Sequence, residues 1–313
     1  MKNPENVEFF NIFGDEHDRF AFPEGIIRVT GGHGGESILF MGSEKTALLD
    51  CGNSYCGQIT ADNLKEALNG RKLDYVILSH SHYDHIGALP YIKRAFPEAT
   101  VLGAENAARI LPRPGARKVM KELGEASRDM YEPGCTVEII TDGLEVDTVI
   151  GDGDVIELGN RTVTVLETKG HTDCSLSFVL QPDSILFASE STGILESIDY
   201  IHTPILKGFD NAMTAFEKCK NCDVKRISLP HFGLIPEHFN DTYWELYQKE
   251  IDKKFDYLRE LKSQGKTDEE IYELYADKYW QPLKAQEQPY EAFAINSKYI
   301  VRVFLDKMEE ENE

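Results

Sequence analysis

The chain has 313 residues, of which 41% are hydrophobic and 28% are charged, as in a folded protein with one large domain or a domain plus an extension. It carries 54 acidic against 33 basic residues, and the resulting formal net charge of -21 disfavours binding to nucleic acid or to an anionic membrane. The charge does not exclude an anionic small substrate, because a bound dication can dominate the field inside a pocket.

The start of the chain and its cysteines indicate in which cellular compartment the protein is expected. The first ten residues lack the basic start and apolar core of a secretory signal, and no stretch approaches the roughly 20 apolar residues of a membrane span. We therefore expect a cytoplasmic protein whose six cysteines are free thiols. Cys219 and Cys222 form a single CxxC pair, for which ordinary thiols are the preferred interpretation and a zinc or redox role is the alternative.

The first hundred residues are predicted to alternate short strands, turns and helices. Residues 25–32 and 36–52 have the pattern of strands, and residues 58–70 have that of a helix ending at an Asn-Gly pair. Residues 73–80 form a continuous apolar run, which is typical of a strand buried on both faces. A further helix is predicted at 87–96.

The middle of the chain changes character twice. Residues 104–131 have a helical, mixed-charge pattern, which predicts an insertion lying over the scaffold. Strand patterns return within 144–190 and 224–233, and a helix is predicted at 209–222 between them.

From residue 240 onward the chain has little glycine and is predicted to be helical. Three helices are expected, at 241–265, 267–280 and 290–310, and Thr267 with Glu270 forms a capping box at the start of the second. We predict a main domain over 1–239 and a C-terminal helical extension over 240–313. The apolar faces of this extension are expected to pack on the main domain or on a second subunit in a homodimer.

Three histidines and an aspartate crowd into six residues directly after the buried strand, in the segment HSHYDH. Imidazole nitrogens and carboxylate oxygens suit divalent first-row metals. His80 and His82 point to the same side of an extended segment and can bind one metal together. Asp84 and His85 lie where the chain turns into a helix, so they can reach a second point nearby.

More candidate ligands follow later strands. His171 comes directly after one predicted strand, His231 after another, and Glu190 stands at the end of a third. Any one of these histidines alone is more often structural. Their repeated placement at strand ends makes the set much stronger evidence for a metal site than its members.

With these residues the chain resembles the metallo-β-lactamase-fold hydrolases. The H-x-H-x-D-H motif lies at 80–85, His171 stands in a GHT segment, His231 matches the last histidine, and TALLDCG ends near Asp50. The resemblance spans about residues 25 to 235 and is specific for fold and metal site, not for substrate. It implies an α/β (α+β) fold, a four-layer αββα sandwich, here with a helical insertion and a C-terminal helical extension.

The resemblance also implies how the ligands divide between two metals. His80, His82 and His171 are expected on the first metal, and the second is expected to be bound by Asp84, His85 and His231. The family's bridging aspartate is replaced here by Glu190, in the segment ASE. Glutamate is one methylene longer, so it can bridge the metals, bind only one of them, or swing away.

Two divalent cations are the cofactors that this ligand set implies. Zinc is the favoured ion, and iron and manganese are alternatives because they accept the same ligands. Such ions lower the pKa of bound water to around 7 and polarise a carbonyl or phosphoryl oxygen. We therefore expect a hydrolase acting on a small-molecule ester, thioester, lactone, amide or phosphodiester.

Several other residues are candidates for roles around the metals. Asp84 is expected to orient the water or carry its proton, and Tyr83 to donate a hydrogen bond to substrate, with simple packing as the alternative for Tyr83. Asp50 is expected to orient a ligand, with turn capping as the alternative. Four residues in predicted loops are expected to contact substrate: His33, Tyr200, His202 and Lys207.

Two other functions stay open. Diiron oxidoreductases of the same fold carry glutamate where this chain has His82, and they add a flavodoxin-like domain that is not evident here. Persulfide dioxygenase relatives use one iron and lack some ligands of the second metal, all of which this chain retains. A non-catalytic metal-binding sensor is the other alternative, because Glu190 departs from the family pattern.

Overall fold

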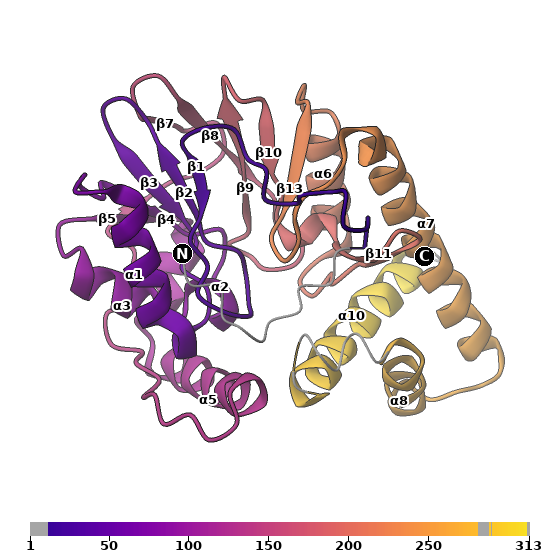
Figure 1. Ribbon diagram of the computed structural model, residues 1–313. Helices are drawn as coiled ribbons and strands as arrows, with labels where there is room; N and C mark the ends of the chain where they lie inside the picture. Colours follow the sequence, from indigo (N-terminus) through magenta and orange to yellow (C-terminus); the bar gives the residue numbers. More distant parts are fainter. Residues whose placement is uncertain (1–11, 281–287, 289, 312–313) are drawn as a thin grey trace.

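The computed structural model describes residues 12–280, 288 and 290–311 (Figure 1). Two six-stranded sheets face each other, one helical layer contains α1 and α3, and α6 and α7 lie outside the second sheet. The predicted four-layer αββα sandwich is therefore confirmed. The helices are α1 (Gly57–Leu68), α2 (Tyr83–Ile86), α3 (Leu89–Ala95), α4 (Glu105–Ile110), α5 (Pro114–Tyr131), α6 (Phe209–Lys220), α7 (Asn240–Ser263), α8 (Asp268–Tyr279) and α10 (Tyr290–Glu310).

The first sheet has the strand order β1-β2-β3-β4-β5-β6. Its first three strands are antiparallel neighbours, whereas β3, β4, β5 and β6 run parallel. Parallel strands leave their carboxyl ends at one edge of a sheet, which is where ligands of α/β folds gather. The strands are β1 (Ile26–Arg28), β2 (Ile38–Met41), β3 (Thr46–Leu49), β4 (Tyr75–Ile77), β5 (Thr100–Gly103) and β6 (Thr148–Val149).

The second sheet has the order β14-β13-β10-β9-β8-β7, with β10 and β13 parallel and the other pairs antiparallel. A separate hairpin, β11–β12, follows a short 3-10 turn, η2 (Glu190–Thr192). The strands are β7 (Val155–Glu157), β8 (Thr162–Glu167), β9 (Leu176–Gln181), β10 (Ile185–Phe187), β11 (Ile194–Ser197), β12 (Tyr200–His202), β13 (Arg226–Leu229) and β14 (Gly233–Leu234).

Local sequence signals explain where several elements end. The helix predicted at 58–70 ends as expected, because Asn69 and Gly70 both adopt left-handed backbone conformations, with φ of 45° and 85°. The capping box at α8 is present: the Thr267 hydroxyl accepts from the Glu270 backbone N–H, and the Glu270 carboxylate accepts from Thr267. The strand predicted at 73–80 is shorter than expected, because its last residues turn towards the ligand cluster.

The described residues form two large hydrophobic cores. The first lies between the sheets and under α1 and α3, and the second joins β10, β13 and α6 to α7, α8 and α10. The C-terminal helices thus bury their apolar faces against residues from before position 240, as expected for packing on the main domain. The division at 239/240 and the homodimer stay predictions.

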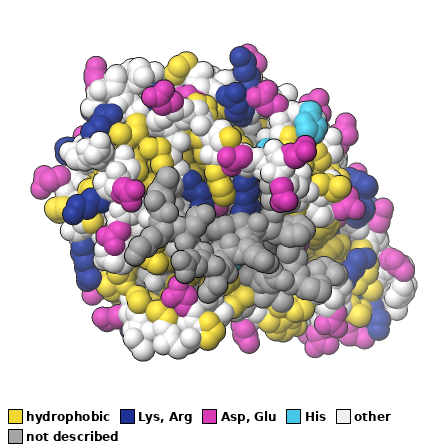
Figure 2. Space-filling view, in the orientation of Figure 1, with side chains coloured by type: hydrophobic (Ala, Val, Ile, Leu, Met, Phe, Trp, Pro, Cys, Tyr) yellow, Lys and Arg dark blue, Asp and Glu magenta, His cyan; other side chains and the backbone are white. Residues whose placement is uncertain are grey.

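The cysteines and the helices show two general features of the chain. Its six cysteines form no disulfide, as expected. Within the described ranges, no helix has both the length and the apolar character needed to cross a membrane. Figure 2 shows acidic side chains spread over the visible face with Lys and Arg between them.

Candidate metal centre

All seven predicted metal ligands lie on segments that leave the strands of the two sheets. His80 and His82 follow β4, while Asp84 and His85 belong to α2 directly behind them. The other three come from the second sheet: His171 follows β8, Glu190 opens η2 after β10, and His231 lies between β13 and β14. Residues up to 151 positions apart in the chain therefore meet at one edge of the sandwich.

These side chains form two groups. The first contains His80, His82, His171 and Glu190, and the second contains Asp84, His85, His231 and Glu190. Within each group, one ligand atom from each residue lies within 4.8 Å of the others. The two groups contain the residues of the two expected ligand sets, with Glu190 common to both, and metal binding by them stays a prediction.

The Glu190 carboxylate lies between the groups with one oxygen directed at each. Its Oε1 is 2.7 Å from His85 Nε2 and 2.9 Å from His231 Nε2. Its Oε2 is 3.1 Å from His171 Nε2. The extra methylene of glutamate therefore does not keep the carboxylate out of the bridging position.

The ring nitrogens of the cluster fit bound cations. His171 Nε2 lies 2.9 Å from His82 Nδ1, and His85 Nε2 lies 3.2 Å from His231 Nε2. His80 Nε2 is buried and has no hydrogen-bond partner among the described residues. Lone pairs that converge in a buried place need a proton or a metal between them, and imidazole with carboxylate is a donor set for zinc, iron or manganese.

Hydrogen bonds on the far side of the rings orient two of these histidines. His85 Nδ1 lies 3.0 Å from Asp50 Oδ2, and His171 Nδ1 lies 2.9 Å from the Pro204 carbonyl oxygen. A carboxylate and a carbonyl only accept hydrogen bonds, so Nδ1 carries the proton in both rings. This leaves the Nε2 lone pair directed into the cluster, as a metal ligand requires.

Asp50 supports both groups at once. Its Oδ1 accepts from the Ser79 backbone N–H at 2.8 Å, and Oδ2 accepts from the Ser79 hydroxyl at 2.6 Å as well as from His85. The Ser79 hydroxyl lies 3.0 Å from His80 Nδ1. Asp50 is buried and has a left-handed φ of 52°, a conformation that Asp tolerates better than most residues. These contacts fit the supporting role proposed for it.

The glycine-rich loop GGHGG contributes a residue that the sequence did not single out. A Cβ atom on Gly35 would overlap the His85 ring, and the Gly35 N–H donates to the Asp84 carbonyl at 2.9 Å. The paired glycines were the available signal. His33 in the same loop stacks on Tyr131 of α5, with ring centroids 4.3 Å apart.

The remaining predicted residues lie outside the two ligand groups. Tyr83 packs against the first core and its hydroxyl lies near Ser127 of α5, an arrangement that fits the packing alternative. His202 is buried with its ring 6.4 Å from that of Phe293, and Lys207 Nζ lies 5.7 Å from the centroid of Tyr299. Tyr200 lines a separate cavity. Substrate contact for Tyr83, His33, Tyr200, His202 and Lys207 stays a prediction.

Helix α7 also supports the centre, which the sequence did not reveal. The Tyr243 hydroxyl donates to the Thr192 carbonyl at 2.7 Å, and the Tyr247 hydroxyl donates to the Ser191 carbonyl at 2.8 Å. Both tyrosines are fully buried, and the two carbonyls belong to the turn that carries Glu190. Their spacing of four residues puts them on one face of the helix, which was the only available signal.

Further along α7, a buried lysine contacts the segment that meets another candidate ligand. Lys254 is fully buried and its ammonium donates to the Thr203 hydroxyl at 2.7 Å. Thr203 precedes Pro204, whose carbonyl accepts from His171. The extension therefore contacts the segments that hold both Glu190 and His171.

Four of the clustered histidines have shifted pKa values, lowered in the first group and raised in the second. Burial lowers the pKa of His80 well below its usual value, and burial followed by the neighbouring His171 lowers the pKa of His82 to about 4. For His85 and His231 burial acts in the same direction, but the nearby carboxylates outweigh it and raise the pKa of both. Burial opposes ionisation of Glu190, yet the surrounding histidines lower its pKa well below the usual range.

Comparisons with known proteins identify the fold family. The model of the metallo-beta-lactamase superfamily matches residues 30–231, a span that contains every candidate ligand. A metallo-beta-lactamase family protein from Thermus thermophilus has a solved structure with a TM-score of 0.59 and 17% identity, covering 90% of this chain and 94% of that one. At this identity the likeness shows the fold alone.

Two curated relatives differ in chemistry. The chain is 31% identical over 163 residues to a coenzyme F420H2 oxidase of Methanothermobacter marburgensis, a match covering 50% of this chain and 34% of the oxidase. It is 24% identical over 246 residues to an atrochrysone carboxyl ACP thioesterase of Aspergillus fumigatus, covering 73% of this chain and 61% of the thioesterase. The chain thus matches less than two thirds of either relative's length.

Proposed function

The chain belongs to the metallo-beta-lactamase superfamily, and on that premise we propose that it is a dinuclear metal-dependent hydrolase. The substrate class is a small-molecule ester, thioester, lactone or phosphodiester, and zinc is the favoured metal. The observation that supports this proposal best is the position of the Glu190 carboxylate, which directs one oxygen at the histidines of the first group and the other at those of the second. Glu190 would help to hold an ion in each group, and such ions would activate water for attack on an acyl or phosphoryl centre.

The protein's own residues would divide the work as follows. When bound, divalent ions supply a nucleophile at neutral pH by lowering the pKa of water, and they polarise the scissile bond. Asp84 Oδ2 lies 3.6 Å from His231 Nε2 and its side chain is 20% exposed, so it can take the proton of the attacking water and pass it to the leaving group. Asp50 holds His85 in the tautomer that leaves Nε2 free.

An iron-dependent oxidoreductase is the second candidate, because two relatives are named as coenzyme F420H2 oxidases. The residue that favours hydrolysis is His82, since the diiron members of the fold carry glutamate at that position. The thioesterase match covers more of this chain than the oxidase match does. A thioester is therefore the first substrate class to examine.

The deciding experiment combines metal analysis with a reporter screen. Purified protein would be loaded separately with zinc, iron and manganese, and then assayed with thioester, ester, lactone and phosphodiester reporters. We expect two ions per chain and hydrolysis of at least one reporter class, lost in Glu190→Ala. Oxygen consumption with iron and no hydrolysis would support the oxidoreductase instead, and a chain that holds no transition metal would refute both.

We also propose a cytoplasmic location and a homodimer formed through the C-terminal helices. Helix α10 exposes Ile295 and Tyr299, apolar side chains that such an interface would cover. Light scattering during gel filtration tests the dimer: a mass of one chain at micromolar concentration would contradict it.

A further inference from the structure

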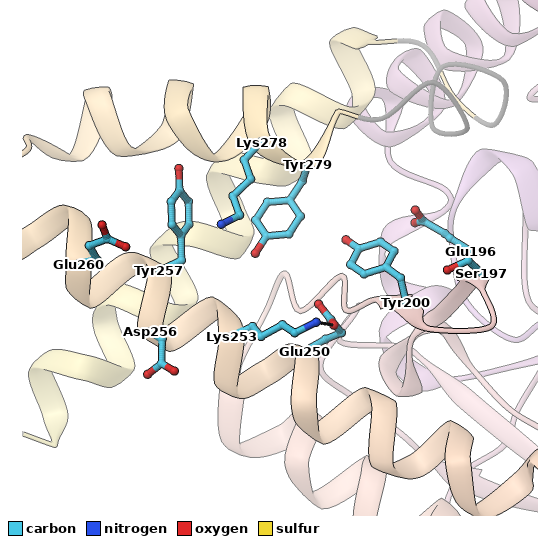
Figure 3. Close-up of a pocket in the computed structure, with 10 residues that line it drawn as sticks. All are labelled: Glu196, Ser197, Tyr200, Glu250, Lys253, Asp256, Tyr257, Glu260, Lys278 and Tyr279. Carbon is cyan, nitrogen blue, oxygen red and sulfur yellow. Dashed lines mark hydrogen bonds and ion pairs between the residues drawn. The ribbon is translucent and has the colours of Figure 1, made fainter.

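A cavity of about 700 Å³ lies between α7, the end of α8 and the β11–β12 hairpin (Figure 3). That volume falls within the usual range of small-molecule sites. None of the candidate metal ligands lines it. From these walls we propose that the cavity binds a small organic ammonium ion, a primary amine attached to an apolar or aromatic body.

The charge of the walls favours a cation. Among the described residues, four carboxylates and two lysine ammonium groups line the cavity, which gives a net of two negative charges. Two of the carboxylates, Glu196 and Glu250, are only 4% and 2% exposed, and Glu250 already accepts from the Lys253 ammonium at 2.5 Å. Because charges at a partly buried place are screened less than those at the surface, the excess of carboxylates over lysines would attract an ammonium ion.

The aromatic walls favour the same kind of ligand. Tyr200, Tyr257 and Tyr279 all line the cavity, and Figure 3 shows their three rings along its walls. Lys278 Nζ already lies 3.7 Å from the centroid of the Tyr257 ring. This ring therefore presents its face to a cation, the arrangement by which aromatic walls hold ammonium ligands.

A buried hydroxyl lies behind the cavity. Tyr275 is fully buried, and its hydroxyl makes no hydrogen bond among the described residues. Burial raises its pKa, and Tyr200, Tyr279 and Glu196 act in the same direction, so the hydroxyl lies beside residues that line the cavity. Tyr275 does not itself line the cavity, so this hydroxyl is a polar group behind its wall and not a direct contact for the ligand.

The proposal can be tested on the full chain with three matched probes. They are 2-phenylethylamine, which is protonated at pH 7, the neutral 2-phenylethanol, and the anionic phenylacetate. Saturation-transfer NMR and calorimetric titration would measure binding of each. We expect saturable binding of the amine and at least tenfold weaker binding of the other two. Equal binding of the alcohol, preference for the anion, or no saturable binding of the amine would overturn the proposal.

Substitutions then locate the site. Tyr257→Leu should weaken binding of the amine about two- to thirtyfold, the range measured for cation–π contacts, and Glu260→Gln should weaken it by a few fold. Lys278→Met removes the competing ammonium, so it should tighten binding. Tyr299→Leu and Glu245→Gln lie outside the cavity and are the matched controls. Binding that is unchanged in Tyr257→Leu, or lost in Lys278→Met, would contradict a cation site here.

Discussion

Replacing Asp50 with asparagine tests the support of the metal centre most directly. Asparagine has nearly the same shape as aspartate. Its Oδ1 can still accept from the Ser79 backbone N–H, which lies 2.8 Å from Asp50 Oδ1 in the structure. Its amide nitrogen, however, would stand where Oδ2 accepts from His85 Nδ1. An amide NH2 only donates, so the His85 proton must move to Nε2, the nitrogen directed at the second group. A protonated Nε2 cannot bind a metal.

The size of the effect follows from that contact. Loss of an outer partner of a metal-binding histidine typically costs 10–100-fold in metal affinity, or about 1.4–2.7 kcal/mol. If the amide turns the other way, Nδ2 faces the Ser79 N–H and that buried bond is lost instead, at about 1–3 kcal/mol of folding free energy. Either orientation therefore gives a measurable deficit.

The assay is competition between the protein and a chelator for zinc, with thermal unfolding of the metal-free protein measured beside it. Asp74→Asn is the matched control, because Asp74 also accepts from a strand N–H, that of Thr46 at 3.0 Å, but contacts no candidate ligand. We expect weaker zinc binding in Asp50→Asn and wild-type zinc binding in Asp74→Asn. Zinc affinity within twofold of wild type in Asp50→Asn, together with unchanged thermal unfolding, would refute the tautomer argument.

Three further predictions follow from the same geometry. His82→Ala or His171→Ala should remove one ion per chain and abolish hydrolysis, as measured by elemental analysis and initial rates; full turnover would contradict the assignment. Tyr247→Phe removes the hydrogen bond to Ser191 beside Glu190 but keeps the ring, so metal affinity should fall up to about tenfold and the absorption spectrum of the cobalt form should change. Tyr257→Phe is the control. Identical cobalt spectra for Tyr247→Phe and wild type would exclude a positioning role for Tyr247. Metal uptake by the second group should strengthen as pH rises from 6 to 8, because His85 and His231, whose pKa values are raised, must release protons to bind. Metal affinity of the first group should depend less on pH, since the pKa of His82 is about 4 and that ring is already neutral. Metal titrations at pH 6 and pH 8 measure this, and an equal change of affinity with pH for the two groups would disprove it.

The sequence, through its motifs and its resemblance to a family, predicted the fold, and the candidate ligands that it named lie close together in the structure. The HSHYDH segment places four candidate ligands within six residues, a spacing that depends only on the local chain. His171, Glu190 and His231 could be added because each follows an apolar run, and strand ends of one sheet share an edge. Helix ends were predictable because their signals are local: Asn69-Gly70 and the Thr267 capping box act on their immediate neighbours.

The tertiary structure decided everything that depends on contacts between distant segments. It determined that Glu190 directs one oxygen at each group, that Asp50 Oδ2 lies 3.0 Å from His85 Nδ1, and that Gly35 lies against the His85 ring. It also showed that the tyrosines of α7 hold the Glu190 turn, and it formed the acidic, tyrosine-lined cavity. The physical reason is that periodicity and spacing specify which face a residue lies on, whereas the partner it meets there depends on how whole layers pack.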